Sequence, residues 1–320
     1  MNNQDVLLKA IRQKTGAAAS VIDTIATILN ISYDAAHRRV SQKSKFSIEE
    51  TIALCRHFGL SMDVLFNDGK KVIVEKTSEI RTMADMGRYF KESAEKLTDY
   101  LDKPHARMFY SAKDIPLFYT IGGTLLSKFK LYVWLNLLAG TQNQERFEAF
   151  TVDQSLLAHS TKLKAVYDHV EVNEIWNDTT INSTLQQIYY FYQSGLLSLP
   201  SALLLGDDLK KILQTAEDRC CNGSNNFHLY YNELLILNNN VLVSSPQQQS
   251  LFVPYTMLGY FITQDVATCN NAADYFKHQV KNSKSLNESG TRDRKLFFNK
   301  AHQKVDFYIQ KMQSEVDLGF

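Results

Sequence analysis

The sequence predicts a mainly α-helical protein, in which a small helical unit at the N-terminus precedes a larger, α-rich α+β domain. Two observations carry this prediction. Short amphipathic runs, each with a helix-start signal, fill residues 1–68, and all five prolines lie at or after Pro104. Beyond residue 79, long helical runs alternate with extended segments rich in aromatic and β-branched residues. With 320 residues, 44% of them hydrophobic, the chain is long enough to bury more than one core.

Five helices are expected in the N-terminal unit, residues 1–68. The first covers QDVLLKAIRQK, where apolar residues recur on one helical face. Each later helix follows a serine whose hydroxyl can cap it. At the fourth helix, Glu50 stands three residues after Ser47 and completes a capping box. The capping serines are Ser20, Ser32, Ser47 and Ser61.

A polar, basic connector at residues 69–78 is expected to link this unit to the second domain, residues 79–320. That domain is expected to open with a long helix over 79–103, whose apolar residues follow roughly one stripe and suit either pairing with a second copy or folding back onto the domain. The extended segments are expected to form a small antiparallel sheet. It includes a hairpin over 227–245 that turns at Asn238–Asn240.

Several classes of protein are disfavoured by the composition and by missing motifs. No run approaches the ~20 apolar residues of a membrane-spanning helix, and the first residues lack an apolar signal segment, which predicts a cytoplasmic protein with no membrane partner. The four cysteines show no CxxC spacing. HExxH, GxGxxG, GxxxxGK and GxSxG are absent, so we expect no catalytic residue, no bound metal and no cofactor. The chain is therefore predicted not to be an enzyme.

One short segment departs from the nearly neutral charge of the chain. Residues 30–45, NISYDAAHRRVSQKSK, carry four cations and no carboxylate in their last nine positions, although the whole chain has a net charge of only +1. The cations are Arg38, Arg39, Lys43 and Lys45. Two interpretations are open: the solvated back of an ordinary helix, or a helix that lies against phosphates.

A helix over residues 32–42 would place these side chains on distinct faces. At 100° per residue, three residues share one face and are expected to be buried: Tyr33, Ala36 and Val40. Arg38 projects from the opposite face among short side chains. Short side chains permit close approach to a DNA groove, an arginine recognises a guanine edge, and flanking cations hold phosphates. The residues expected to contact DNA are Ser32, Asp34, His37, Arg38, Arg39, Ser41, Gln42, Lys43 and Lys45.

The surroundings of this helix resemble the Cro and phage-repressor family of helix-turn-helix domains, also called the XRE family. Ala26 stands in the first helix of the motif, and Ile31–Ser32 opens the second. Ser47–Glu49 is similar to the family's Ser-hydrophobic-acid start of the next helix. The stretch GLSMDVLF, residues 59–66, is similar to the family's Gly-hydrophobic-Ser-hydrophobic-Asp ending. The resemblance covers about a fifth of the chain.

The chain departs from the family pattern at three positions. Asn30 replaces the usual turn glycine, which asparagine tolerates because it enters the left-handed region more readily than other non-glycine residues. Ile22 replaces a glutamine that often supports DNA contacts, and Ala36 replaces the usual larger aliphatic residue. The fold expectation survives these changes, but no particular base contact can be transferred.

The resemblance implies a sequence-specific transcription regulator, typical of bacteria, that binds double-stranded DNA through a recognition helix at residues 32–42. Because one short helix gives a small footprint, we expect a homodimer held together by the larger domain. That domain is also a candidate sensor of a small-molecule or peptide effector. Three alternatives stay open: a peptide-responsive regulator with a helical-repeat sensor, a protein–protein adaptor that does not bind DNA, and, with least support, an enzyme.

Overall fold

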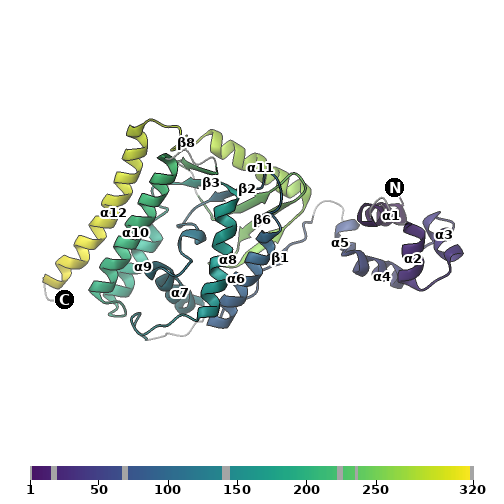
Figure 1. Cartoon of the computed structure of the whole chain (residues 1–320), viewed down its shortest axis with the longest axis horizontal. Coiled ribbons are helices and arrows are strands. Elements are labelled where there is room, and N and C mark those ends of the chain that lie inside the picture. Colours follow the sequence, from purple (N-terminus) through teal and green to yellow (C-terminus); the bar gives the residue numbers. More distant parts are fainter. Residues whose placement is uncertain are drawn as a thin grey trace. The chain divides into compact units, whose positions relative to one another are not determined.

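The computed structural model describes residues 2–15, 20–66, 71–138, 145–221, 226–234 and 237–317. The chain divides into two compact units, Met1–Ile73 and Val74–Phe320, and each has its own hydrophobic core (Figure 1). The division falls inside the connector expected at residues 69–78. None of the helices in the described ranges is both long and apolar enough to cross a membrane.

The N-terminal unit consists, in its described residues, of five helices around a small core. Ser20, Ser32 and Ser47 each accept a hydrogen bond from the backbone N–H three residues on, and Glu50 closes the capping box of the fourth helix. The five expected helices are present. Their bounds are α1 Asn3–Thr15, α2 Val21–Leu29, α3 Tyr33–Val40, α4 Ile48–Phe58 and α5 Met62–Leu65. The buried core residues are Leu7, Leu8, Ile11, Ile25, Ala36, Leu54 and Cys55.

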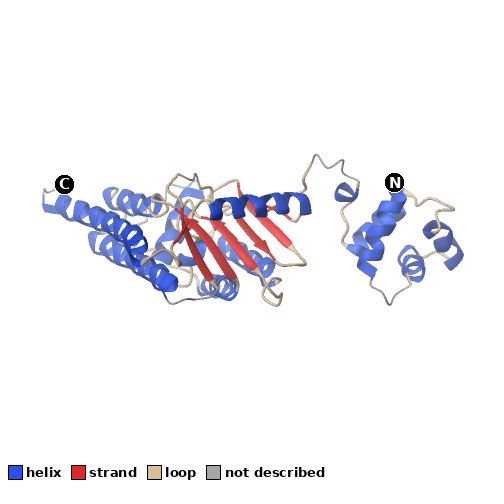
Figure 2. Ribbon diagram, turned by 90° about the horizontal axis from the view of Figure 1, so that it is seen from above, coloured by secondary structure: helices blue, strands red, loops and turns tan. Residues whose placement is uncertain are grey.

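A mixed sheet, eight-stranded in the described residues, forms the centre of the C-terminal unit (Figure 2). Its strand order is β1-β7-β6-β5-β2-β3-β4-β8. The neighbours β2, β3 and β4 run parallel, and the remaining neighbouring pairs are antiparallel. The strand bounds are β1 Glu75–Lys76, β2 Arg107–Ser111, β3 Glu171–Trp176, β4 Phe227–Tyr231, β5 Val241–Ser244, β6 Gln249–Pro254, β7 Tyr260–Thr263 and β8 Lys284–Ser285.

Helices cover both faces of this sheet, but unequally. Because side chains alternate along a strand, Trp176 joins a large core on one face and Ile175 joins a smaller core on the other. Cys269 and Phe276 of α11 cover the smaller core. On the large core, α6 packs along α8, and α10 packs along α12 (Figure 1). The helix bounds are α6 Met83–Thr98, α7 Leu125–Leu138, α8 Gln154–His169, α9 Asn182–Gln193, α10 Leu199–Cys221, α11 Val266–Lys281 and α12 Thr291–Asp317, with a short 3₁₀ helix η1 at Leu117–Tyr119.

The helix expected over 79–103 is shorter than predicted. The Thr82 hydroxyl accepts a hydrogen bond from the Asp85 N–H, and the Asp85 carboxylate accepts one from the Thr82 N–H. This capping box fixes the start of α6 at Met83, because the backbone of a capping residue is not helical. The apolar face of α6, including Phe90, is buried in the core of its own unit. The stripe is therefore used inside the chain and is not a free pairing surface.

The second half of the expected connector belongs to the sheet. β1 pairs with the edge of β7, and the Thr77 N–H donates to the Tyr260 carbonyl at 3.0 Å. In return, the Tyr260 N–H donates to the Thr77 hydroxyl at 2.9 Å. These bonds make the second unit begin at Val74 rather than at residue 79.

The prediction of an antiparallel sheet with a hairpin over 227–245 is wrong, because the strands pair differently. The two expected arms, β4 and β5, are separated by β2 and β3, and β5 instead forms a hairpin with β6. Asn239 does adopt a positive φ of 61°, but its side-chain oxygen accepts hydrogen bonds from the N–H groups of Lys113 and Asp114, beyond the end of β2. The segment therefore crosses to another part of the sheet and does not turn back on itself.

The strand β3 has no counterpart among the predicted elements. A strand buried between two parallel neighbours normally reads as a continuous apolar run. In β3, Asn173 and Glu174 interrupt that run although both are buried. The sheet is therefore mixed, with a parallel centre that the sequence pattern does not reveal.

Candidate nucleic-acid interface

A tight turn joins α2 to α3. Asn30 has φ 50° and ψ 48°, the left-handed conformation, and the Ile31 N–H donates to the Ala26 carbonyl at 3.0 Å. Ser32 then caps α3, because its hydroxyl accepts a hydrogen bond from the Ala35 N–H at 3.3 Å. Asparagine thus occupies the glycine position of the turn as expected, and the first turn of α3 is fixed by hydrogen bonds.

The residue of α3 that is most deeply buried in the N-terminal core is small. Ala36 is fully buried in the N-terminal core, and Val40 is partly buried beside it. The expectation that Tyr33 is buried with them is wrong, since 53% of this residue is exposed. Tyr33 lies in the first turn, outside the N-terminal core, where its ring stacks on His37 with 15° between the ring planes. The alanine therefore allows α3 to pack closely on the core.

The opposite side of α3 is open to solvent. Arg38 is exposed on the helix, and Lys43 and Lys45 are exposed in the loop after it. Among the described residues, no carboxylate forms an ion pair with any of these three cations. The predicted site also includes the exposed residues Ser32, Asp34, His37 and Ser41. We call these four residues, together with Arg38, Lys43 and Lys45, the α3 surface.

Arg39 has a different role from the one expected. Its Nε and Nη2 donate to the two carboxylate oxygens of Glu50 at 2.9 and 2.7 Å, and its Nη1 donates to the Ala35 carbonyl at 3.1 Å. The side chains of Arg39 and Glu50 are only 21% and 19% exposed. Hydrogen bonding from Arg39 lowers the pKa of Glu50, because it stabilises the charged carboxylate. Arg39 therefore joins α3 to α4, and its contact with DNA stays a prediction.

Gln42 is also held within the unit. Its backbone is left-handed, with φ 63°, so α3 ends at Val40 and not at residue 42. Its side-chain amide donates to the carboxylate of Asp5 on α1. Although Gln42 is exposed, this bond turns its amide toward α1, and its assignment to DNA is not supported by the geometry.

Gln4 contributes to the site without having been predicted. Its amide donates to the carbonyls of Arg39 and Ser44 at 2.8 and 2.9 Å, and its oxygen accepts from the Phe46 N–H at 3.4 Å. These bonds hold both ends of the loop that carries Lys43. No sequence motif identifies Gln4, because the contacts join residues about 40 positions apart.

The α3 surface can recognise an anionic, grooved partner. Arg38 offers a planar set of donors, and the loop lysines offer point charges for phosphates. Asp34 stands in the first helical turn, where a carboxylate is favoured by the helix dipole and can accept a hydrogen bond from a cytosine amino group. The turn at Asn30 and the Arg39–Glu50 pair fix the position of α3 relative to α2 and α4.

A buried polar cluster in the C-terminal unit is the other prominent group of ionisable residues. Glu174 is fully buried and accepts hydrogen bonds from Tyr167 Oη at 2.6 Å and Trp176 Nε1 at 2.8 Å. The Arg219 guanidinium lies 4.0 Å from the centre of the Phe227 ring and donates to Tyr167 Oη at 3.3 Å. Burial raises the pKa of Glu174 to about 7. Because its carboxyl group is sealed from solvent and hydrogen-bonded, this cluster is part of the core.

No metal site stands out in the described ranges, since no group of three or more His, Cys, Asp or Glu side chains there is arranged to hold an ion. Comparison of the chain with models of known families, with curated proteins and with solved structures found no match.

Proposed function

We propose that this chain is a DNA-binding transcription regulator of the Cro/phage-repressor (XRE) type, whose α3 enters the major groove of double-stranded DNA. One observation supports the proposal: Arg38 on α3 and Lys43 and Lys45 in the loop after it are exposed, and none of them has an ion-pair partner among the described residues. A rigid helix with few bulky exposed side chains suits close approach to base edges. The role involves no catalytic step.

The main rival is a protein–protein adaptor with the same helices. The two functions differ in their dependence on salt, because DNA binding releases one counterion for about each phosphate that a cation neutralises. Fragments of total genomic DNA bound by the full chain would first be selected and sequenced. For a dimer that uses six cations, log affinity for a selected site should fall against log salt with a slope of about −5. An adaptor would select no DNA.

Within the site, Arg38 is expected to contact a base and Lys43 a phosphate. Arg38→Ala should weaken binding by about 1–3 kcal/mol and relax the preference at one base position. Lys43→Ala should weaken binding to all sequences alike and flatten the salt slope by about one unit. Competition titrations with single-base operator variants distinguish the two effects. An Arg38→Ala protein with unchanged affinity and unchanged preference would refute this placement of α3.

We further propose that the chain binds DNA as a homodimer held together after residue 77. Two linked DNA-binding units convert the second contact into an intramolecular step, with an effective concentration on the order of millimolar. The operator should then be roughly palindromic, with half-sites about one helical turn apart. Light scattering gives the mass of the full chain, and titration compares its affinity with that of a fragment, residues 1–73. A monomeric full chain, or a fragment that binds as tightly, would contradict the proposal.

A further inference from the structure

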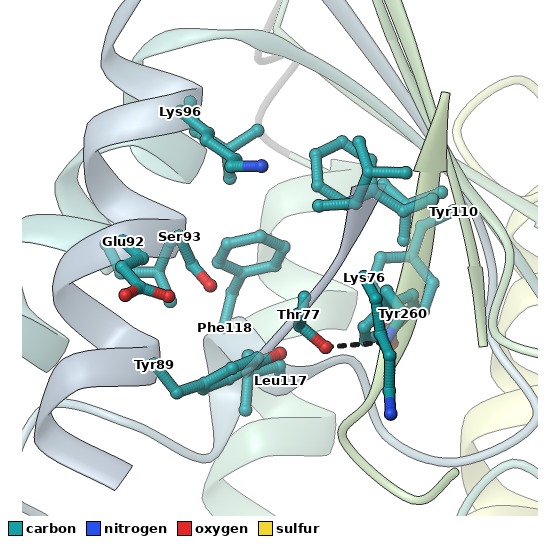
Figure 3. Close-up of a pocket in the computed structure, with 15 residues that line it drawn as sticks. Lys76, Thr77, Tyr89, Glu92, Ser93, Lys96, Tyr110, Leu117, Phe118 and Tyr260 are labelled. Carbon is teal, nitrogen blue, oxygen red and sulfur yellow. Dashed lines mark hydrogen bonds between the residues drawn. The ribbon is translucent and has the colours of Figure 1, made fainter. Parts of the chain in front are cut away.

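A cavity in the C-terminal unit lies between α6 and the edge of the sheet that β1, β7 and β6 form; we call it the α6–β7 cavity (Figure 3). Its volume is about 80 Å³. A cavity needs roughly 10–15 Å³ to hold one water, so this cavity has room for roughly six water-sized groups. That size fits a single ring or a short chain.

The wall of the α6–β7 cavity is mostly aromatic and apolar. Tyr89 and Tyr110 are buried, and the Phe118 ring stands between α6 and the sheet in Figure 3. Leu97 and Ile262 close the wall from α6 and β7. An apolar ligand body can pack against these side chains, and the wall also contains the hydroxyl groups of Thr77, Tyr110 and Tyr260.

The wall also carries polar groups, both on α6 and on the edge of the sheet. In Figure 3 the Lys96 ammonium and the Ser93 hydroxyl project from α6 toward the side of Phe118. The Tyr89 hydroxyl points from α6 toward Thr77 in Figure 3, and burial raises the pKa of Tyr89, so this hydroxyl stays protonated and able to donate. Glu92 also belongs to the wall, but its carboxylate accepts a hydrogen bond from the Ser78 hydroxyl at 3.2 Å. Donors from α6 therefore line one side of the cavity, and the other side combines apolar side chains with Lys76, Thr77, Tyr110 and Tyr260.

We propose that the α6–β7 cavity binds a small carboxylic acid with an aromatic or short aliphatic body. The body would pack against Phe118 and Tyr110, and the carboxylate would accept hydrogen bonds from Lys96 and Ser93. A charge-assisted bond to an ammonium is stronger than one between neutral groups, so the acid should bind more tightly than a neutral ligand of the same shape.

Lys96 has a weakly held partner that such a ligand can replace. Its ammonium pairs with Glu75 on β1, and the side chains of Lys96 and Glu75 are 41% and 71% exposed. An ion pair at this exposure contributes little to stability, so a ligand carboxylate can take the place of Glu75 when the body of the ligand also binds. β1 immediately follows the boundary between the two units, so binding would change the restraint on the segment that joins them.

The first experiment is calorimetric titration of the full chain with three ligands of nearly equal shape: phenylacetate, 2-phenylethanol and phenethylamine. We expect phenylacetate to bind about tenfold more tightly than the alcohol and the amine to bind most weakly. The reverse order of acid and amine would assign the cavity to cations through Glu92 and overturn the proposal. Absence of heat for all three at millimolar concentration would overturn it as well.

Variants of α6 place the binding in this cavity. Lys96→Met should remove the preference for the acid over the alcohol, whereas Lys91→Met, an exposed lysine of the same helix, should leave it unchanged. Ser93→Leu should fill the space and abolish binding of both ligands, whereas Ser93→Ala should retain the alcohol and weaken the acid. Circular dichroism melting of each variant shows that it is folded. Binding of phenylacetate by a folded Ser93→Leu protein at unchanged affinity would place the site elsewhere.

Only the regulatory consequence rests on the proposed DNA-binding function. Operator affinity of the full chain should change on saturation with phenylacetate, and this change should vanish in Lys96→Met. The two proposals fail in different ways: calorimetry tests the cavity without DNA, and Arg38→Ala tests DNA binding without ligand. Calorimetric binding with no change in operator affinity would keep the ligand site and remove its role as an effector site.

Discussion

The two units of this chain treat ionisable residues in opposite ways. In the described part of the N-terminal unit the buried residues are all apolar, and the charged pair Arg39–Glu50 keeps about a fifth of each side chain exposed. In the C-terminal unit Lys130 and Glu174 are almost fully buried. Lys130 donates to Asp114 and to Gln187, both at 3.0 Å. The larger unit therefore buries charge with partners, whereas the smaller one excludes it.

The difference follows from the size of the two cores. Taking a charge out of water is unfavourable by several kcal/mol unless partners surround it, and a large core can supply those partners from several elements. Glu174, for example, is contacted from β3 itself and from α8, which carries Tyr167. A core of a few residues between short helices cannot provide as many polar partners for a buried charge. Three predictions test this contrast.

The largest effect is expected for a new charge in the small core. Ala36→Glu should destabilise the N-terminal unit by about 3 kcal/mol or more, because the carboxylate would be buried without a partner. Ala35→Glu, on the neighbouring and less buried position, should mainly affect DNA binding. Both tryptophans, Trp134 and Trp176, lie in the C-terminal unit. In Ala36→Glu, circular dichroism should therefore show a thermal transition of the N-terminal unit at a lower temperature than the transition seen by tryptophan fluorescence. Equal melting temperatures of Ala36→Glu and Ala35→Glu would contradict the assignment of faces.

A smaller effect, and one that depends on pH, is expected for Glu174. Its folded pKa of about 7 lies above the 4.5 usual for a glutamate, so the folded state holds a proton that the unfolded chain releases between these values. The unfolding free energy of the C-terminal unit should thus fall as pH rises from 4.5 to 7, by up to about 3 kcal/mol. Glu174→Gln should remove this part of the dependence, whereas Glu95→Gln, at an exposed position, should not. Denaturant titrations at several pH values give the unfolding free energy of each variant. If the pH dependence of this free energy were unchanged in Glu174→Gln, it would come from other groups.

The smallest effect is expected for the partly exposed Arg39–Glu50 pair of the N-terminal unit. Arg39→Met should lower the stability of that unit by about 1–2 kcal/mol, because Glu50 loses two hydrogen bonds while keeping access to water. Arg38→Met is the matched control and should leave stability unchanged. Below the melting temperature, Arg39→Met should keep the base preference that Arg38→Met relaxes. Equal stabilities of the two variants would mean that Arg39 does not join α3 to α4.

The same contrast explains which parts of the fold could be predicted. In the N-terminal unit the second, third and fourth helices each begin at a local capping signal, such as Ser47 with Glu50. In the C-terminal unit the decisive pairings are distant: β2 lies beside β3 across more than 60 residues. Asn173 and Glu174 also prevent β3 from being recognised in the sequence, because they interrupt its apolar run. Both can be buried because the tertiary structure supplies their hydrogen-bond partners. The hairpin prediction failed for the same reason, since turn residues at Asn239 do not determine which strands meet.

The sequence predicted the exposed residues of the candidate site, but not the internal contacts that hold α3 and the loop after it. The positions of Arg38, Lys43 and Lys45 follow from helical periodicity and from the loop after it. Arg39 has the same chemistry, but its partner Glu50 lies 11 residues on, beyond a turn. Gln4 depends on contacts that span about 40 residues. Periodicity therefore identifies which side chains face solvent, and it cannot identify which of them the fold uses internally.

The pairing of β1 with β7 has a consequence for the time course of synthesis. Every residue of the N-terminal unit and β1 itself precede β7, whose last residue, Thr263, is made roughly 190 residues later. At 5–20 residues per second this interval is about 10–40 s, during which the nascent chain carries a folded helical unit followed by an edge strand with no partner. Val72 and Val74, which are exposed even in the finished protein, flank that strand and would be available to chaperones that bind short apolar segments. The sheet edge beside the α6–β7 cavity is thus among the last parts of the molecule to form on the ribosome.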